Sequence, residues 1–280
     1  VVKPVFFPGG DIGSLAVHGT VNDLAMCGGR PLFMSAGFII EEGFPMADLE
    51  RIIASMGRAA SQAQVAIVTG DTKVVARGAA DAIFINTAGI GLIEYAGAIG
   101  VRSIQAGDVV VLSGTLGDHG AAIMSRRENL GLSTPILSDS APLNGLVLEI
   151  LKASAYIHCM RDATRGGLGA ILVEIAQQAG FTIEIQEQVI PVREEVKGVC
   201  EILGLDPLFL ANEGKMAVFC PEPQADAVLS AMRSHPYGQD AAVIGTVKPA
   251  QGKGRLIMHT LIGGSREVDM PTGELVPRIC

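Results

Sequence analysis

The chain has 280 residues, of which 49% are hydrophobic and 18% are charged, and its formal net charge is -8 at pH 7. This composition supports a substantial core and excludes a disordered protein, while the acidic balance disfavours a nucleic-acid footprint or an anionic membrane surface. The apolar stretches are interrupted before the ~18 residues that a membrane span needs, so we expect small-molecule chemistry or protein partners, with no nucleic acid and no membrane.

The first third of the chain alternates short β-like runs with helical stretches. The run at residues 1–7 predicts a strand, and the turn from Pro8 to Asp11 leads into a helix that ends near Cys27. Pro45 opens a second helix, whose apolar residues recur on one face. Further strands are expected at residues 32–40, 65–69 and 82–94, the second of them buried and followed by Gly70 and Asp71.

Residues 97–107 contain several glycines and little periodicity, and we place a domain boundary there. The clearest later element is a helix at residues 166–179, whose apolar side chains form one stripe. Other helices are expected at 120–129, 143–154, 193–203 and 224–235, and strands at 108–113, 182–185, 215–220, 241–247 and 256–259. Several connections are too short for parallel crossovers. The sequence therefore predicts a mixed α/β, or α+β, fold with domains at residues 1–97 and 98–269 and a flexible tail at 270–280.

The tail ends in a cysteine, Cys280. Pro271 and Pro277 fix φ and lack an N–H donor, which predicts an extended or coiled segment that reaches roughly 30 Å. A thiol on such a tail can act far from the body of the protein, although chain ends are also commonly disordered. The other cysteines are scattered without a C-x-x-C pair, which predicts buried free thiols in a reducing cytoplasm: Cys27, Cys159, Cys200 and Cys220.

Polar clusters interrupt the apolar chain at residues 20–23 and 69–73. Asn22 and Asp23 stand among apolar helix residues, which indicates a pair turned towards a site. Asp71 follows an expected strand and a glycine, where a carboxylate can bind magnesium, an ion that prefers oxygen ligands. Lys73 can pair with a phosphate or a developing oxyanion. Taken singly, Asp71 fits an ordinary turn better, and Lys73 fits a solvated edge position better.

A third cluster, at residues 161–167, precedes the clearest helix. Gly166 and Gly167 allow a ligand to approach the backbone at the helix start, where free amides favour an anion, and Arg165 adds positive charge. Asp162 and Thr164 belong to the same cluster. The alternative is that these two residues cap the helix.

A fourth cluster, at residues 212–215, precedes an expected buried strand. Its Glu213 can act as a general base, although a lone glutamate in a turn is usually solvated. His119 opens another helix and fits a capping or packing role better than a catalytic one. The common nucleotide signatures are absent from the sequence, so phosphate binding would need a different fold.

These motifs occur together in an order that resembles one known family: FFPGG, GTVNDLAM, GFIIEEG, VTGDTKVV, SGTLGDHG, RDATRGGLG, NEGK and the terminal PRIC. Over its whole length the chain resembles the HypE family of hydrogenase maturation proteins, the carbamoyl dehydratases, and the terminal PRIC is the most diagnostic motif. That family is similar to aminoimidazole ribonucleotide synthetase, selenophosphate synthetase and thiamine monophosphate kinase. The resemblance implies an ATP-binding fold of two α/β domains and a homodimer formed through the first.

The resemblance also implies a reaction. A partner carbamoyltransferase places a carbamoyl group on Cys280, and ATP-dependent dehydration converts it to a thiocyanate, which supplies cyanide to an iron-carrying scaffold for NiFe hydrogenase. ATP and Mg²⁺ are the implied cofactors. We expect Glu213 to act as base and Lys73 to stabilise negative charge, with Asp23 and Asp71 as magnesium ligands. The implied nucleotide pocket comprises Asn22, Asp23, Asp71, Asp162, Thr164, Arg165, Gly166 and Gly167.

Family members carry a glycine-rich segment and a threonine-aspartate pair upstream of the first strand, and this chain has neither. We therefore expect these 280 residues alone to bind and turn over ATP weakly. A phosphotransferase resembling thiamine monophosphate kinase is the alternative enzyme, and it would not need Cys280. A non-catalytic scaffold with a docking tail is the alternative of another class, in which Lys73 and Glu213 would be dispensable.

Overall fold

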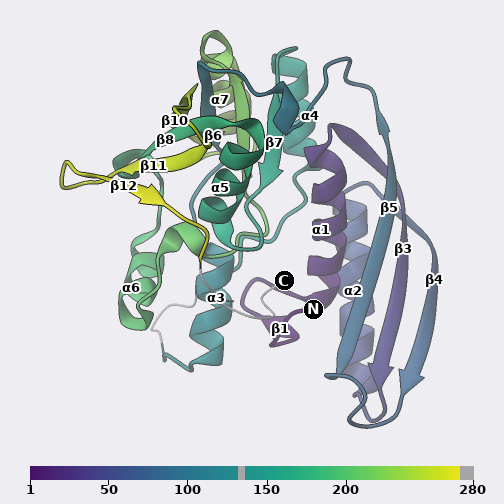
Figure 1. Ribbon diagram of the computed structural model, residues 1–280. Helices are drawn as coiled ribbons and strands as arrows, with labels where there is room; N and C mark the ends of the chain where they lie inside the picture. Colours follow the sequence, from purple (N-terminus) through teal and green to yellow (C-terminus); the bar gives the residue numbers. More distant parts are fainter. Residues whose placement is uncertain (132–135, 272–280) are drawn as a thin grey trace.

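The structure is a computed structural model that describes residues 1–131 and 136–271, and it contains two larger sheets with helices packed against them (Figure 1). The first sheet has the strand order β4-β3-β5, in which the central strand pairs parallel with β4 and antiparallel with β5. The elements up to this sheet are β1 (Phe6–Phe7), β2 (Gly10–Asp11), α1 (Ile12–Met26), β3 (Gly29–Glu41), α2 (Met46–Gln62), β4 (Ala66–Val75) and β5 (Ile83–Ile93).

Helices α1 and α2 cover one face of the first sheet, and no helix of the described residues lies on the opposite face (Figure 1). Paired residues of neighbouring strands share a face, and successive residues alternate between faces. Ala36 and Met34 of β3 are buried under the helices, whereas Phe33 and Ile39 of the same strand are 44% and 43% exposed. The first sheet therefore has an apolar inner face in the core and a partly apolar outer face in solvent.

Helix α1 lies between the two sheets and is buried on more than one side. Asp11 caps its start, because the Asp11 side chain accepts hydrogen bonds from the backbone amides of Gly13 and Ser14. Val17 and Val21 face the first sheet, and Ala25 reaches the core of the second. Since both sides of α1 are covered, polar residues on this helix must find partners inside the protein.

The second sheet has the strand order β12-β11-β8-β10-β6-β9-β7, in which the described neighbours pair antiparallel except β8 and β11. Its strands are β6 (Asp108–Leu112), β7 (Cys159–Asp162), β8 (Phe181–Gln186), β9 (Met216–Pro221), β10 (Ala242–Pro249), β11 (Arg255–His259) and β12 (Ser265–Val268). The accompanying α-helices are α3 (Asp118–Arg127), α4 (Asn144–Ala153), α5 (Gly167–Ala179), α6 (Glu194–Leu203) and α7 (Ala225–Ser234). Short 3-10 turns lie at η1 (Val101–Ser103), η2 (Glu187–Val189), η3 (Pro207–Phe209) and η4 (Glu222–Gln224).

Both faces of the second sheet are covered. In β6, Val110 and Leu112 pack with α5, while Val109 and Val111 pack with α4 and α7. A strand that is buried on both faces reads as a continuous apolar run. This explains why the β6 sequence DVVVL shows no alternation.

The mixed class predicted from the sequence is confirmed, and most of the predicted helices lie within a few residues of their observed bounds. Two expectations were wrong, and two strands were missed. The strand predicted at residues 1–7 is reduced to Phe6–Phe7, because a turn and the short β1-β2 pairing replace it. The strand predicted as buried at 65–69 is the exposed edge strand β4, which continues through Gly70 and Asp71. Strands β7 and β12 were not predicted, since each has four residues and little periodicity.

The proposed domain boundary after residue 97 stays a prediction; β5 ends at Ile93, and β6 begins at Asp108. Within the described ranges, no helix has the length and apolar character that a membrane crossing requires.

Candidate active site

A pocket of about 210 Å³ lies beside α1, where the first sheet approaches the loop at residues 212–215. Asp23 of α1 and Glu213 of the loop contribute carboxyl groups to its wall. The other lining residues are mainly apolar, with two hydroxyl groups: Val1, Ile12, Leu15, Ala16, Gly19, Thr20, Ile85 and Thr87. A small apolar pocket with a few convergent polar groups is typical of a ligand site.

Glu213 is a buried carboxylic acid with an unused oxygen. The residue is 3% exposed, and its Oε1 has no hydrogen-bond partner among the described residues. Burial, followed by the charges of Asp139, Asp162 and Asp23, raises the pKa of Glu213 well above its usual value. A carboxyl group with a raised pKa is a stronger base when ionised and can exchange protons near neutral pH. The structure thus places Glu213 inside the protein, which excludes the solvated-turn alternative.

Asp23 and Asp162 form an acidic pair next to this pocket, one from α1 and one from the end of β7. Burial raises the pKa of Asp23, and the nearby Arg161 partly opposes that shift. Burial and then the charge of Asp23 raise the pKa of Asp162. The described residues include no cluster of three or more His, Cys, Asp or Glu side chains able to hold a metal. The two carboxylates of Asp23 and Asp162, whose negative charges are only partly neutralised by nearby cations, do fit Mg²⁺. This ion commonly takes one or two carboxylates and completes its coordination shell with water and phosphate oxygens.

Asn22 is engaged by the backbone of other segments. Its amide nitrogen donates to the carbonyl oxygens of Ala141 (3.0 Å) and Glu213 (3.3 Å). Its side-chain oxygen accepts from the amide of Leu143 at 2.7 Å. Because both amide hydrogens and the carbonyl are used, Asn22 supports the site by joining α1 to two loops.

The 161–167 cluster ends in the start of α5. Gly166 is the N-cap residue with φ 73°, and no side chain caps this helix, so the alternative that Asp162 and Thr164 cap α5 was wrong. Gly167 also has positive φ, and a Cβ there would lie 2.6 Å from two backbone oxygens. The start of α5 therefore lies beside Arg165 without a side-chain cap, and a helix N-terminus beside a positive charge favours a phosphate.

Asp71 and Lys73 lie on the outer face of the first sheet. Ala36 of β3 pairs with Gly70 of β4 and Thr87 of β5, so these three residues point to the same face of the sheet. That face is the one covered by the helices, because Thr87 donates a hydrogen bond to the Ala16 carbonyl of α1. The adjacent row contains Asp71, and Lys73 is two residues further along, so both point the opposite way. Their side chains are 75% and 73% exposed and form an ion pair at 3.8 Å.

Within one chain, therefore, the sheet separates Asp71 from Asp23 and Lys73 from Glu213. The family resemblance grouped these residues, and the sequence alone placed Asp71 directly after the end of a strand. Gly70 instead continues β4, where a Cβ would lie only 2.2 Å from the carbonyl oxygen of Ala36. This glycine marks a close approach of two strands.

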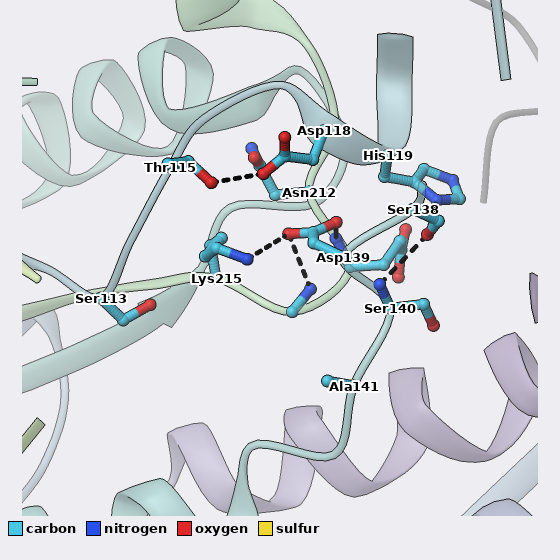
Figure 2. Close-up of polar contacts among 12 residues, drawn as sticks. Ser113, Thr115, Asp118, His119, Ser138, Asp139, Ser140, Ala141, Asn212 and Lys215 are labelled. Carbon is cyan, nitrogen blue, oxygen red and sulfur yellow. Dashed lines mark hydrogen bonds and ion pairs between the residues drawn. The ribbon is translucent and has the colours of Figure 1, made fainter. Parts of the chain in front are cut away.

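Residues 138–143, which we name the clamp segment, were not singled out from the sequence. The carboxylate of Asp139 accepts hydrogen bonds from the amides of Glu213 (3.0 Å) and Gly214 (3.3 Å) and from Lys215 Nζ (3.1 Å), and Figure 2 shows the ion pair. Although burial opposes the shift, Lys215 and the Glu213 amide hold the pKa of Asp139 below its usual value. Both charged side chains are nearly inaccessible, at 3% and 12% exposure.

Two buried histidines flank the clamp segment. His119 Nδ1 lies 2.8 Å from Ser138 Oγ, and its ring meets Phe7 edge-on, so the orienting partner that the sequence did not reveal is present (Figure 2). His18 Nδ1 lies 2.9 Å from Ser140 Oγ. Burial lowers the pKa of His18 to about 4, so this imidazole is neutral at pH 7.

A second polar group supports the same region from the side of α3 (Figure 2). Thr115 donates a hydrogen bond to Asp118, and Asn212 accepts one from the amide of Gly117. The amide nitrogen of Asn212 donates to the carbonyl oxygens of Ala163 and Leu210. The loop that carries Glu213 is therefore anchored at its first residue as well.

The predicted acceptor thiol, Cys280, lies outside the described residues. Of the other cysteines, three are buried as expected, and burial raises the pKa of Cys159 to about 12. Cys27 is exposed, which corrects the expectation that it is buried. It ends α1 as the C-cap residue, where the helix reaches the surface.

Comparison with known families gives two matches that together span most of the chain. The AIR synthase related protein N-terminal domain matches residues 1–93, and the AIR synthase related protein C-terminal domain matches residues 105–257. The AIR synthase-like fold expected from the sequence is confirmed by these matches.

Individual relatives are similar over the whole chain. Carbamoyl dehydratase HypE of Azotobacter vinelandii is 53% identical over 280 residues, which cover 100% of this chain and 82% of the relative. A crystal structure of hydrogenase maturation protein HypE in complex with ATP has a TM-score of 0.96 and 50% identity and covers 100% of this chain and 84% of that chain.

A structure of a HypE-HypF complex has a TM-score of 0.93 and 51% identity, covering 96% of this chain and 88% of that chain. Thiamine monophosphate kinase from Aquifex aeolicus has a TM-score of 0.65 at 22% identity, covering 91% and 81% of the two chains. At that identity, the kinase shares the fold alone.

Proposed function

This chain belongs to the HypE family of carbamoyl dehydratases, and we propose that it uses ATP to convert an S-carbamoyl group on its own Cys280 into a thiocyanate. The observation that carries this proposal is the buried Glu213, whose unused Oε1 is next to the acidic pair Asp23 and Asp162. A base is needed beside a phosphate site in such a dehydration, and these residues supply that combination.

The reaction balances as follows. The carbamoyl oxygen attacks the γ-phosphorus of ATP, the bond to ADP breaks, and one nitrogen proton is lost as a carbon-nitrogen double bond forms. The second nitrogen proton is then removed, the carbon-oxygen bond breaks, and inorganic phosphate leaves as the carbon-nitrogen triple bond forms. Oxygen leaves easily only as phosphate, so positioning of the γ-phosphoryl group and removal of the two protons are the demands on the protein.

Glu213 would remove the two protons from the carbamoyl nitrogen. Its buried carboxyl has a raised pKa, which makes the ionised form a stronger base than a solvated glutamate. Ile12, Leu15 and Ile85 form an apolar part of the pocket wall beside Glu213. We assign Glu213 the removal of protons from the carbamoyl nitrogen.

Groups around Asp23 and Asp162 would position the γ-phosphoryl group. Asp23 and Asp162 would hold Mg²⁺, which neutralises phosphate charge when bound. The start of α5, which no side chain caps, and the charge of Arg165 would receive phosphate oxygens. Gly166 and Gly167 form the turn before this helix, and the carbonyl of Thr164 fixes that turn by accepting the amide of Gly167. Asn22 would act by positioning, since its amide is fully bonded.

The site further requires a second copy of the chain. Lys73 and Asp71 lie on the outer face, away from the pocket, among apolar residues that include Phe33, Ile39 and Ile90. An exposed apolar sheet face is typical of an interface. We infer a homodimer through this face, in which Lys73 and Asp71 of one copy complete the site of the other.

Mixing two inactive variants tests this dimer. Lys73→Ala and Glu213→Gln chains, unfolded and refolded together, form mixed dimers in which one site has both native residues. We expect about one quarter of the sites to be active in an equal mixture. Dehydration that stays absent in the mixture, with mixed dimers verified by mass, would overturn the shared site.

The wider pathway follows from the chemistry. A carbamoyltransferase would load Cys280, and a structure that pairs a relative with HypF supports such a partner. The cyanide would pass to an iron-carrying scaffold during hydrogenase maturation. We place the reaction in the cytoplasm, because the described cysteines are free thiols.

Mass spectrometry of the tail tests the proposed function. The full-length protein is incubated with the carbamoyltransferase, carbamoyl phosphate and ATP, and the Cys280 peptide is followed. We expect a carbamoyl adduct that loses one water only when ATP is present, and Cys280→Ala serves as the control. Phosphorylation of a small molecule by the Cys280→Ala protein would instead favour a phosphotransferase. Weak ATP binding by these 280 residues alone stays a prediction, which calorimetry tests.

A further inference from the structure

The side chain of Glu213 is not held by hydrogen bonds to its Oε1, so the position of this oxygen depends on the backbone that carries it. A catalytic group displaced by about 1 Å can cost roughly 100-fold in rate. The contacts that fix residues 212–215 therefore matter for the chemistry, although none of them touches the pocket.

The peptide groups around Glu213 are bound on both sides. The Glu213 and Gly214 amides donate to the two carboxylate oxygens of Asp139. The Glu213 carbonyl accepts from the amide of Ala141 at 3.3 Å and from Asn22. The clamp segment thus binds this loop through hydrogen bonds made by the Asp139 side chain and the Ala141 backbone.

The fit between these two segments is too close for a side chain at position 214. A Cβ on Gly214 would lie 1.9 Å from the carbonyl oxygen of Asp139. Real Cβ atoms do not approach so near, so only glycine lets the loop reach the Asp139 carboxylate. The glycine that follows Glu213 is thus explained by this contact.

Lys215 completes the arrangement by neutralising Asp139 at 3.1 Å. A buried ion pair contributes little net stability compared with apolar packing, but it defines one geometry. Here that geometry joins Asp139 to residues 213, 214 and 215 in succession. An ion pair placed merely to stabilise the fold would not need to bind the two amides as well.

We propose that Asp139 is a positioning residue for the dehydration, which holds Glu213 by binding the backbone of its loop. This inference rests on the proposed function, because it assigns Glu213 the proton removal. Asp139 does not line the pocket, and the proposed role is exerted through Glu213. The clamp segment and the 212–215 loop then form one unit, although 74 residues separate Asp139 from Glu213.

A double-mutant cycle tests the proposal in the full-length protein loaded with a carbamoyl group. Asp139→Asn keeps the shape but replaces one acceptor oxygen by a donor, which opposes the amide or ammonium that it faces. We expect kcat for ATP-dependent water loss to fall about 100-fold with the ATP KM within about two-fold. In a protein that already carries Glu213→Gln, Asp139→Asn should not lower kcat further. The reason is that both substitutions would act on the same catalytic group, so their effects on kcat would not add.

Asp108→Asn is the matched control. Asp108 is also buried, its carboxylate accepts a hydrogen bond from the Gln105 amide, and it lies 2.8 Å from His158 Nδ1. Asp108 is the first residue of β6, and the site lies beyond the other end of this strand. We expect this variant to lose stability with kcat nearly unchanged. Gly214→Ala, which forces the loop away from Asp139, is the second test variant and should lower kcat as Asp139→Asn does.

The outcomes separate the two proposals. If the unsubstituted protein loses no water from its carbamoyl group, the proposed function fails. If it does, and Asp139→Asn either retains kcat or lowers it equally in the Glu213→Gln background, the positioning role is overturned. Failure of both Asp139→Asn and Gly214→Ala to fold would also overturn it, because the contact would then serve the fold as a whole.

Discussion

The pocket around Glu213 and the outer face of the first sheet carry the two members of the proposed catalytic pair, yet they are built in opposite ways. Glu213 is buried, and its loop is bonded to α1, the clamp segment and the region before α3. Lys73 stands in solvent and contacts Asp71 at 3.8 Å. The comparison teaches that the chain itself organises the residues around Glu213, whereas Lys73 could complete the site only if a second copy covered the outer face, as proposed above.

The same contrast explains a misleading signal in the sequence. The apolar run before Asp71 predicted a strand inside the protein, but Ile67 and Val68 of β4 are 37% and 60% exposed. An apolar run indicates an apolar environment without showing whether the same molecule provides it. The outer-face residues Phe33, Ile39 and Ile90 are what the proposed homodimer would cover.

The largest effect is expected from the pocket side of the comparison. Glu213→Gln keeps the size of the side chain and removes its basicity, so the rate of ATP-dependent water loss from carbamoylated Cys280 should fall by roughly 100-fold to 10,000-fold. Quenched mass spectrometry of the tail peptide measures this rate. Glu222→Gln, at an exposed position, is the control. A rate within two-fold of the unsubstituted protein would remove Glu213 from the mechanism.

The two ion pairs, Asp139 with Lys215 and Asp71 with Lys73, allow the same substitution to be compared in both regions. Lys215→Met leaves the Asp139 carboxylate buried without its cation, which should lower the free energy of unfolding by about 3–5 kcal/mol. Urea denaturation at pH 7 measures it. A loss below about 1 kcal/mol would mean that Asp139 takes up a proton or reaches water, and the buried half of the site would then be less rigid than its contacts indicate.

The pH dependence of stability gives a smaller effect on the pocket side. The pKa of His18 falls from 6.5 to about 4 on folding because burial disfavours the imidazolium. The folded state therefore resists protonation. The contribution of His18 is complete above pH 6.5 and is lost as the pH falls towards 4, by about 3 kcal/mol in total.

Denaturation at several pH values checks this prediction. Asp23, Asp162 and Glu213 have raised pKa values and act with the opposite sign, since the folded state binds their protons more readily. The difference between the unsubstituted protein and His18→Gln isolates the histidine. Parallel stability curves for the two proteins between pH 7 and pH 4.5 would show that water reaches His18.

The sequence predicted structure correctly where the local residue pattern determines it, and it did not reveal residues whose role depends on contacts with distant parts of the chain. Helix α5 was predictable because Leu168, Ile171 and Ile175 recur at helical spacing and all are buried. Glu213, Asp23 and Asp162 were singled out by motif and resemblance, and their roles stay predictions. Asp139 was missed because it lies in an irregular segment, where no periodicity marks it and its partners are 74 to 76 residues away.

The smallest expected effect on stability belongs to the outer face. Lys73→Met removes an ion pair whose members are both mostly exposed, so the free energy of unfolding should change by no more than about 0.5 kcal/mol. The same variant should nevertheless lose most of the dehydration rate, because Lys73 is proposed to act on the carbamoyl group held by the other copy. Urea denaturation and tail mass spectrometry on one preparation give both quantities. If Lys73→Met dehydrates normally, the outer face serves only to hold the dimer together, and the pocket side alone performs the chemistry.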